Sequence, residues 1–556
     1  MLSKTRKSLL TAAYSAGLIC LLVFLRSLWC GFVNLDDAFY VEHNPLIKGI
    51  DADALQRLFT EPQQGAWLPL SIISFAIDNF FWRGNPVGYH LTNILLHAAN
   101  TVLVVLMADR LFQYLDSRFE PIRNNRYLYP AMLLLAGLIF GIHPMRVESV
   151  TWVSERKDVL NGLFTLGSVL FYLRYVQKKS MPGENITAVR EYCLSVGLFA
   201  LSLMSKQVSV VLPVMLLVID WFPLGRIRRA NLLPVLIEKL PYLVLSLALS
   251  FITLSWASKG NMMIAAGDFP FYARCLVSGN DLFEYCRYLL YPVGIVPFFV
   301  IGDTIQLSFV VKTAVVVTFT CFCLGSARKW PVLGAVWACF LLPLLPVLAF
   351  TQSADDTAIA SRYTYLSSVV PSIAAGVLLI VGYLSLTRKW PRLAHILIPS
   401  VIVMLLIFYG TMTLRLIAAW KNTGTLWTRQ IEVQPLGRAY IYRGTYSSSI
   451  GDNNAAINDF SVAINIAQKA GRDDIFNIYA YRGEAFRALG LYEAAIDDFT
   501  VAINMSGQPL YYYFRGSALK ALGRSAEAEE DFRRAGDQRG PIPWFPAKYN
   551  QRSPDK

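Results

Sequence analysis

Eleven apolar runs, separated by short polar loops, fill the first three quarters of the chain. Most of them approach the length of about 20 helical residues that crosses a hydrocarbon core of about 30 Å. We expect spans at about residues 8–29, 88–113, 127–142, 159–174, 194–204, 208–218, 233–256, 307–324, 332–350, 362–387 and 394–416. The pattern therefore predicts an all-α, polytopic membrane domain over residues 1–420.

The positions of Lys and Arg orient these spans. Each short loop that we assign to the inside carries at least two basic residues, as cytoplasmic loops do. The basic start of the chain puts its N-terminus in the cytoplasm. We interpret the first run as a permanent span, because no small-x-small cleavage site follows it. The first outer loop (about 30–87) and the C-terminal region are then external, and 271–290 is expected as an amphipathic helix on the outer surface.

The C-terminal part of the chain is polar and repetitive. Three copies share a Gly, a second Gly seven residues later and a Phe nine residues after that; they are Gly444–Phe460, Gly483–Phe499 and Gly516–Phe532. Their first glycines are 39 and then 33 residues apart. Helical repeats of about 34 residues with small residues at fixed positions are typical of tetratricopeptide solenoids. We expect a linker over 421–436, three repeats over 437–540 and a tail over 541–556.

Composition agrees with a membrane protein and changes how the charge is interpreted. Hydrophobic residues make up 55% of the chain and charged residues 16%. The net charge of +13 would suggest nucleic acid in a soluble chain, but here the basic residues fall mostly in the short loops and report orientation. The eight cysteines show no metal-ligand spacing. The sequence has no Gly-rich phosphate loop and no cytoplasmic domain for a nucleotide sugar, so nucleotide-driven chemistry on the inner side is not expected.

Two adjacent acids, Asp36 and Asp37, directly follow the first apolar run. Acids beside a membrane span are energetically expensive and mark functional sites. One of them could accept the proton of a hydroxyl as a general base, or help to hold a divalent cation such as Mg²⁺ or Mn²⁺ against a phosphate. Because neighbouring side chains point in different directions, we expect one catalytic and one orienting carboxylate, with Asp37 as the preferred base. The alternative is a helix cap or a solvated loop.

Basic residues on the same outer side could bind an anion. Arg146, Arg156 and Lys157 fall in the polar loop 143–158, Lys206 lies between two apolar runs, and Arg362 precedes Tyr363. Arg binds phosphate through a bidentate fork and Lys as a point charge. The alternatives are salt bridges within the loop, lipid headgroup contacts and snorkelling of Lys206. On 88–113, His90, Asn93 and His97 share one helix face, where hydrogen bonding between helices is favoured over a metal site.

Several of these stretches together resemble a known family. They are Asp36-Asp-Ala-Phe-Tyr-Val-Glu-His-Asn-Pro45, Gly88-Tyr-His-Leu-Thr-Asn-Ile-Leu-Leu-His97, His143-Pro-Met-Arg-Val-Glu-Ser-Val-Thr-Trp-Val-Ser-Glu-Arg-Lys-Asp-Val-Leu160, Ser361-Arg-Tyr-Thr-Tyr-Leu366, 204–213 and 220–225. The acidic pair resembles the first-loop motif of GT-C glycosyltransferases. The whole chain resembles the transmembrane-and-tetratricopeptide O-mannosyltransferases and their bacterial relatives, although its repeat array is shorter than theirs.

The resemblance implies a polyprenyl-phosphate-linked sugar as donor and an extracytoplasmic reaction. It implies Asp36 or Asp37 as the catalytic carboxylate, and as the metal ligand if a metal takes part. The cations expected at the donor phosphate are Arg146, Arg156, Lys157, Lys206 and Arg362. The residues expected around the substrate cavity are His90, His97, His143, Glu148 and Tyr363.

The expected partners are the lipid-linked donor, membrane lipids and a protein or peptide acceptor held by the repeats, with no nucleic acid. The expected location is the bacterial inner membrane with periplasmic repeats, or the endoplasmic reticulum with luminal repeats in a eukaryote. Two other functions stay open from the sequence. One is a membrane-anchored scaffold for envelope assembly, in which the acids and cations are incidental. The other is a transporter or flippase for lipid-linked sugars, which predicts paired internal repeats of the spans.

Overall fold

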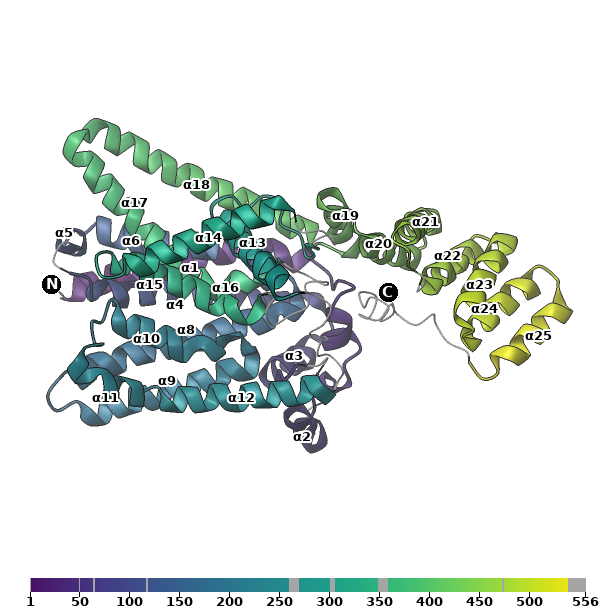
Figure 1. Ribbon diagram of the computed structural model, residues 1–556, viewed down its shortest axis with the longest axis horizontal. Helices are drawn as coiled ribbons and strands as arrows, with labels where there is room; N and C mark the ends of the chain where they lie inside the picture. Colours follow the sequence, from purple (N-terminus) through teal and green to yellow (C-terminus); the bar gives the residue numbers. More distant parts are fainter. Residues whose placement is uncertain are drawn as a thin grey trace. The chain divides into compact units, whose positions relative to one another are not determined.

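The computed structural model describes residues 2–49, 51–63, 66–116, 119–259, 270–300, 306–348, 359–472 and 475–538. The chain divides into two compact units, Met1–Trp420 and Lys421–Lys556. Both units are built of helices (Figure 1), and no β-strand occurs in the ranges given above. The predicted all-α fold is confirmed. The predicted tail, 541–556, lies outside the described residues.

The helices of the first unit alternate between long apolar helices and short connecting ones. In chain order they are α1 (Leu2–Phe24), α2 (Ala52–Thr60), α3 (Pro69–Trp82), α4 (Pro86–Gln113), α5 (Glu120–Arg123), α6 (Leu128–Gly141), α7 (Val147–Thr151), α8 (Arg156–Lys179), α9 (Asn185–Ser205), α10 (Leu212–Trp221), α11 (Leu232–Ile237), α12 (Leu240–Lys259), α13 (Phe271–Leu290), α14 (Leu307–Gly325), α15 (Pro331–Leu341), α16 (Thr364–Ser367), α17 (Val369–Lys389) and α18 (Pro391–Ala419).

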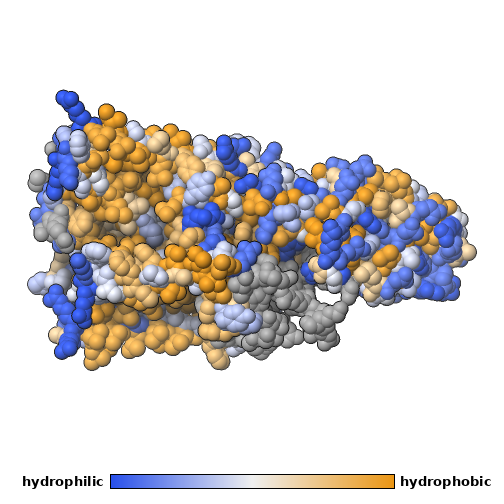
Figure 2. Space-filling model, turned by 45° about the horizontal axis from the view of Figure 1, so that its top comes forward, coloured by the Kyte–Doolittle hydropathy of each residue, from blue (hydrophilic) through white to orange (hydrophobic). Residues whose placement is uncertain are grey.

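Within the described ranges, seven helices are long and apolar enough to cross a membrane, or nine if each of two bent helix pairs crosses once. The bent pairs are Leu128–Gly141 with Pro144–Thr151 and Arg229–Ile237 with Leu240–Thr253. Figure 2 shows the broad hydrophobic surface that these helices present. The chain is therefore a multi-pass membrane protein.

The described helices that are long and apolar enough to cross a membrane are fewer than the eleven spans that the sequence predicts. Within the described residues each of the eleven runs contains helix, but two form shorter helices, Gln207–Trp221 and Pro331–Val347. The first begins with a 3₁₀ turn, and the second ends in one that contains Pro343 and Pro346. Because proline lacks the backbone N–H that continues an α-helix, the apolar run is longer than the regular helix it forms.

Small residues let the central helices approach closely. Helices α1, α4, α6 and α17 pack against one another, and α8 packs against α4 and α9. A Cβ on Gly137 of α6 would lie 2.5 Å from the Cγ2 atom of Val105 and 2.9 Å from the Cβ atom of Ala16. Such close helix contacts are typical of membrane interfaces, where small residues replace hydrophobic burial as the means of association. This packing fixes the N-terminal end of α8, where the candidate site lies.

Helix α13 was expected on the outer surface as an amphipathic helix. The structure confirms the helix, but packs it against α14 and buries Tyr285 and Tyr288 in a hydrophobic cluster. Its charged residue Glu284 binds Lys312 of α14 at 2.7 Å. The helix is therefore an integral part of the first unit.

A second ion network, here called the Glu238 network, lies at the C-terminal end of α8. Both carboxylate oxygens of Glu238 accept from Arg226 Nη2, at 2.7 and 2.8 Å, and Oε1 also binds Lys179 Nζ at 2.7 Å. Asp220 binds Arg226 at 2.8 Å and Lys239 at 2.6 Å. These groups join α8 and α10 to the bend between α11 and α12, so the buried charges are paired where two helices break.

The second unit is a solenoid of seven described helices. They are α19 (Thr423–Val433), α20 (Gly437–Ser449), α21 (Asn453–Lys469), α22 (Phe476–Ala488), α23 (Tyr492–Ser506), α24 (Pro509–Ala521) and α25 (Ser525–Ala535). Consecutive helices pack against each other. The repeat glycines allow this packing, because a Cβ on Gly483 would lie 3.0 Å from the Phe499 ring. The structure thus shows the helical solenoid expected from the spacing.

In each repeat the same Arg–Asp ion pair joins the two helices. An Arg forks onto an Asp sixteen residues later, and its third nitrogen donates to a hydroxyl of the preceding helix pair. In the middle repeat, Arg482 binds Asp498 at 2.8 Å through two nitrogens and Ser461 Oγ at 3.0 Å. The equivalent trios are Arg443, Asp459 and Thr428, and Arg515, Asp531 and Thr500.

Helix α19 lies in the stretch that the sequence analysis assigns to a linker. An Asn422 capping box begins it. Trp427 stacks on Tyr442 with ring centroids 4.6 Å apart, as Phe460 stacks on Tyr481 in the next repeat. The solenoid therefore begins one helix before the first recognisable repeat, because Trp427 takes the position that Phe occupies in the later copies.

Candidate functional site

The loop that follows α1 is fastened to the start of α8 by Asp37. Its Oδ2 atom accepts from Val33 N at 3.0 Å, and its Oδ1 atom accepts from the backbone and hydroxyl of Ser154. Asp37 is 1% exposed. Burial raises the pKa of Asp37 to about 7, although the hydrogen bonds from Ser154 and Val33 act to lower it. The three donors leave Asp37 no free face for a substrate, so its geometry is that of an orienting residue.

Asp36 has the opposite environment. Its side chain is 43% exposed, and its Oδ2 atom lies 3.5 Å from Lys157 Nζ. Lys157 also lies over the ring of Tyr40, at 5.2 Å from the centroid. An accessible carboxylate beside a cation can take a proton from a bound hydroxyl. The geometry therefore favours Asp36 as the reactive member of the pair, in place of the preference for Asp37 stated above.

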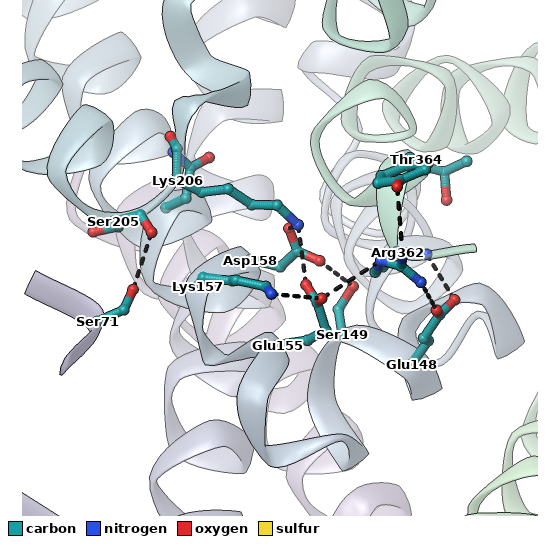
Figure 3. Close-up of polar contacts among 12 residues, drawn as sticks. Ser71, Glu148, Ser149, Glu155, Lys157, Asp158, Ser205, Lys206, Arg362 and Thr364 are labelled. Atoms are coloured by element: carbon teal, nitrogen blue, oxygen red, sulfur yellow. Dashed lines mark hydrogen bonds and ion pairs between the residues drawn. The ribbon is translucent and has the colours of Figure 1, made fainter. Parts of the chain in front are cut away.

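Three of the five predicted phosphate-binding cations converge beside Asp36. They are Lys157, Lys206 and Arg362, here called the cation cluster. The nearest atoms of Glu155 lie 3.1 Å from Lys157 Nζ, 3.0 Å from Lys206 Nζ and 3.4 Å from Arg362 Nε (Figure 3). Each of the three basic side chains retains some exposure, between 13% and 15%, whereas Glu155 is buried. The three cations are therefore partly accessible to solvent, whereas the carboxylate that they share is not.

Each cation also has a second acidic partner. Lys157 binds Asp36. Lys206 binds Asp158 at 2.5 Å, and Arg362 binds Glu148 (Figure 3). Glu148 further accepts from the Ser361 hydroxyl at 2.6 Å and from the Arg362 backbone at 3.0 Å. These contacts join α7, α8, the α9–α10 connection and the turn Ser361–Tyr363 in one network.

Aromatic rings surround the same cations. Trp152 lies 5.9 Å from Lys157 and 5.5 Å from Arg362, and Tyr363 lies 5.9 Å from Lys206. Cation–π contacts of this kind hold cations in place without neutralising them. Tyr363 was predicted at the substrate cavity; Trp152 was not, although its position within the polar loop 143–158 was a signal for it.

The other two predicted phosphate-binding cations lie in the core. Arg156 is fully buried, binds Asp78, and donates to Asn93 Oδ1 at 2.7 Å and Tyr89 O at 2.7 Å. Arg146 is also fully buried and donates to the backbone and hydroxyl of Thr364. Burial removes both guanidinium groups from contact with a ligand in this conformation, so they act here as packing elements.

The predicted cavity histidines are buried as well. His97 bridges helices, since its Nδ1 atom lies 2.8 Å from Tyr365 Oη and its Nε2 atom 2.9 Å from Gly141 O. His143 lies 3.1 Å from Leu289 O through Nε2, and His90 is fully buried on α4. The expectation that polar residues on α4 bond to neighbouring helices agrees with these contacts. Among the predicted cavity residues, Glu148 and Tyr363 touch the cation cluster.

Over the described part of the chain, no group of three or more His, Cys, Asp or Glu side chains is arranged to hold a metal ion. Asp36 is paired with Lys157, and both oxygens of Asp37 accept hydrogen bonds. Within the described residues, the acidic pair is thus not part of a preformed cluster of metal ligands.

Comparison with known proteins gives one consistent set of relatives. Human protein O-mannosyl-transferase TMTC4 is 27% identical over 231 residues, which is 40% of this chain and 31% of that protein. Human protein O-mannosyl-transferase TMTC1 is 27% identical over 38% of the chain, and the Drosophila melanogaster protein Tmtc1 is 30% identical over 28% of it. The chain resembles the protein O-mannosyl-transferases. The predicted resemblance is confirmed.

The match to these protein O-mannosyl-transferases is partial. The aligned region spans about a third or less of the length of each, from 31% of the human TMTC4 protein to 18% of the Drosophila protein. No family model matches the chain, and no solved structure matches it. The site residues and their roles therefore rest on this chain's own geometry.

Proposed function

We propose that the chain is a membrane glycosyltransferase that moves a sugar from a polyprenyl-phosphate donor to a hydroxyl group of a protein. The observation that carries the proposal is the accessible carboxylate of Asp36, 3.5 Å from a lysine that belongs to a three-cation cluster. A general base beside an anion-binding site is what glycosyl transfer from a phosphate requires. The names of the relatives support a protein as the acceptor.

In this mechanism Asp36 accepts the proton of the acceptor hydroxyl. The hydroxyl oxygen forms the new bond to the anomeric carbon of the sugar, and the bond between that carbon and the phosphate oxygen breaks. The electron pair leaves with the phosphate, whose added negative charge is stabilised by Lys157, Lys206 and Arg362. Stabilisation of charge that develops in the transition state is usually the largest single contribution to catalysis.

Asp37 supports the reaction by holding the loop that carries Asp36. Its bonds to Val33 and Ser154 connect the loop that carries Asp36 to the residues directly before Glu155 and Lys157. Asp36 is thereby held in register with Glu155 and Lys157, as catalytic groups need to be. Asp37 is a positioning residue in this proposal.

In this proposal the reaction takes place on the extracytoplasmic side. Helix α8 carries the site at its first turn and Lys178 and Lys179 at its last. A helix of 24 residues spans about 36 Å, so the two ends lie on opposite sides of a bilayer. Basic residues favour the cytoplasmic side, which supports an external position for the site. In a bacterial inner membrane the solenoid would then be periplasmic, where its repeats can hold a protein acceptor.

The test is transfer by the purified full-length protein in lipid nanodiscs. A radiolabelled polyprenyl-phosphate mannose and a Ser/Thr-rich acceptor peptide are supplied, and label in the peptide is measured. The proposal predicts transfer that requires both substrates and no nucleotide. Folded protein that binds neither the donor nor polyprenyl phosphate would contradict it and would favour a membrane-anchored scaffold, since a scaffold needs no donor site.

A further inference from the structure

Glu155 is the point on which the cation cluster converges. Its Oε1 atom contacts Lys157 and Arg362, and its Oε2 atom contacts Lys206 (Figure 3). In the described ranges of the chain, no other carboxylate contacts all three cations. The other acids each hold one of them: Asp36 holds Lys157, Asp158 holds Lys206 and Glu148 holds Arg362. Glu155 is therefore the counter-ion that the three cations share, and each of the other three acids binds one cation of the cluster.

The cations come from segments that are far apart in the sequence. Lys157 lies in the first turn of α8, Lys206 lies 51 residues after Glu155, and Arg362 lies in the turn Ser361–Tyr363. Like charges repel, and Asp36, Asp158 and Glu148 each draw one cation toward a different element. Without a shared carboxylate, nothing in these contacts keeps the three cations within reach of one anion.

The backbone of Glu155 is fixed on both sides. Ser154 is bound by Asp37 through its backbone and hydroxyl groups. Arg156 is anchored in the core by Asp78, Asn93 and Tyr89. Glu155 ends the 3₁₀ turn Val153–Glu155 between these two anchors. The backbone that carries its carboxylate is thus held in place by contacts that do not involve the cations.

We propose that Glu155 is a positioning residue that gathers Lys157, Lys206 and Arg362 into one anion-binding cluster before the donor phosphate arrives. The proposal rests on the proposed function, because the anion is the phosphate of the lipid donor. Glu155 acts from the buried side of the cluster, and the phosphate binds from the side on which the cations are exposed. Preorganised cations cost no rearrangement when the ligand binds, so the loss of Glu155 weakens donor binding more than it slows the chemical step.

The test compares Glu155→Gln with the wild-type full-length protein in nanodiscs. Direct binding of a polyprenyl monophosphate without sugar is titrated first, and donor kinetics follow. The expected result is at least a tenfold rise in the Kd for polyprenyl phosphate and in the donor KM, with kcat at saturating donor changed less than threefold. Glu155→Asp keeps the charge on a shorter side chain and is expected to recover part of the affinity.

Glu238→Gln is the matched control. Glu238 is also a buried carboxylate shared by cations at the end of a span, through Lys179 and Arg226. Its replacement should lower thermal stability while leaving polyprenyl-phosphate affinity unchanged. This separates loss of a buried ion network in general from loss of the cation cluster.

The outcomes distinguish the two proposals. Unchanged or tighter binding by Glu155→Gln overturns the positioning role, because tighter binding would make Glu155 a competitor of the phosphate. If Glu155→Gln does not fold, equal affinity of Glu155→Asp and wild type overturns it instead. A wild-type protein that neither binds polyprenyl phosphate nor transfers sugar overturns the proposed function itself.

Discussion

The division of roles between the two adjacent acids predicts a large effect of removing Asp37, and a small effect of removing Asp36, on the stability of the loop that follows α1. Asp37→Ala deprives two buried backbone N–H groups, those of Val33 and Ser154, of their acceptor, together with the Ser154 hydroxyl. The hydroxyl can rotate toward another partner, but the two N–H groups cannot. Leaving a buried donor unsatisfied costs about 1–3 kcal/mol, so the two together cost about 2–6 kcal/mol. Because about 1.4 kcal/mol is a factor of ten, opening of this loop becomes at least about 30-fold more frequent.

Hydrogen exchange measures this opening directly. The amides of Val33 and Ser154 should lose at least about 30-fold of their protection in Asp37→Ala, in line with the lower limit of about 2 kcal/mol. Asp36→Ala is the control, since its one ion pair with Lys157 is partly exposed, and such pairs contribute about 0–1 kcal/mol. Equal protection of both amides in wild type and Asp37→Ala would refute the orienting role of Asp37.

The remaining predictions concern stability and pH. Arg226→Ala should destabilise the first unit by about 3–5 kcal/mol, measured by thermal unfolding, because it strips the buried Glu238 of a partner; a change below about 1 kcal/mol, the value of an exposed pair, would contradict this. Gly483→Ala should destabilise the solenoid by about 1–3 kcal/mol, since its Cβ would lie 3.0 Å from Phe499, whereas Gly437→Ala meets only ordinary contacts and serves as the control. Between about pH 4 and 7 the folded state keeps the proton of Asp37 that the unfolded chain releases, so stability should fall as pH rises, by at most about 1.4 kcal/mol per pH unit. Asp37→Asn should remove that part of the slope, and an unchanged slope in chemical denaturation would show that Asp37 does not titrate there.

The sequence predicts the helical elements because their signals are local. The repeat glycines lie at fixed spacing from the Phe residues that pack on them, and each of the eleven apolar runs contains helix in the described residues. The sequence did not predict helix α19, because this helix carries one Trp in place of a complete repeat. The site is different, because its contacts join distant segments. Ser154 lies 117 residues after Asp37, so the sequence could suggest that one acid orients the other but not which one.

The cations show the same limit. Loop 143–158 contains Arg146, Arg156 and Lys157 within twelve residues, and nothing local separates them. Their depth depends on where α8 begins relative to α3 and α4. Arg156 therefore turns into the core toward Asp78, while the next residue, Lys157, faces Asp36. The convergence on Glu155 follows from tertiary packing and was not visible in the chain order.

The central claim is that Asp36 is the base of a glycosyl transfer, and Asp36→Asn tests it most directly. The measurement is the rate of transfer of labelled sugar from the polyprenyl-phosphate donor to the acceptor peptide at saturating donor, for wild type and variant in the same nanodiscs. Removal of a general base costs about 10²–10⁴-fold in rate. The account predicts a loss of that size with unchanged thermal stability and unchanged binding of polyprenyl phosphate. Transfer by Asp36→Asn at close to the wild-type rate would contradict it.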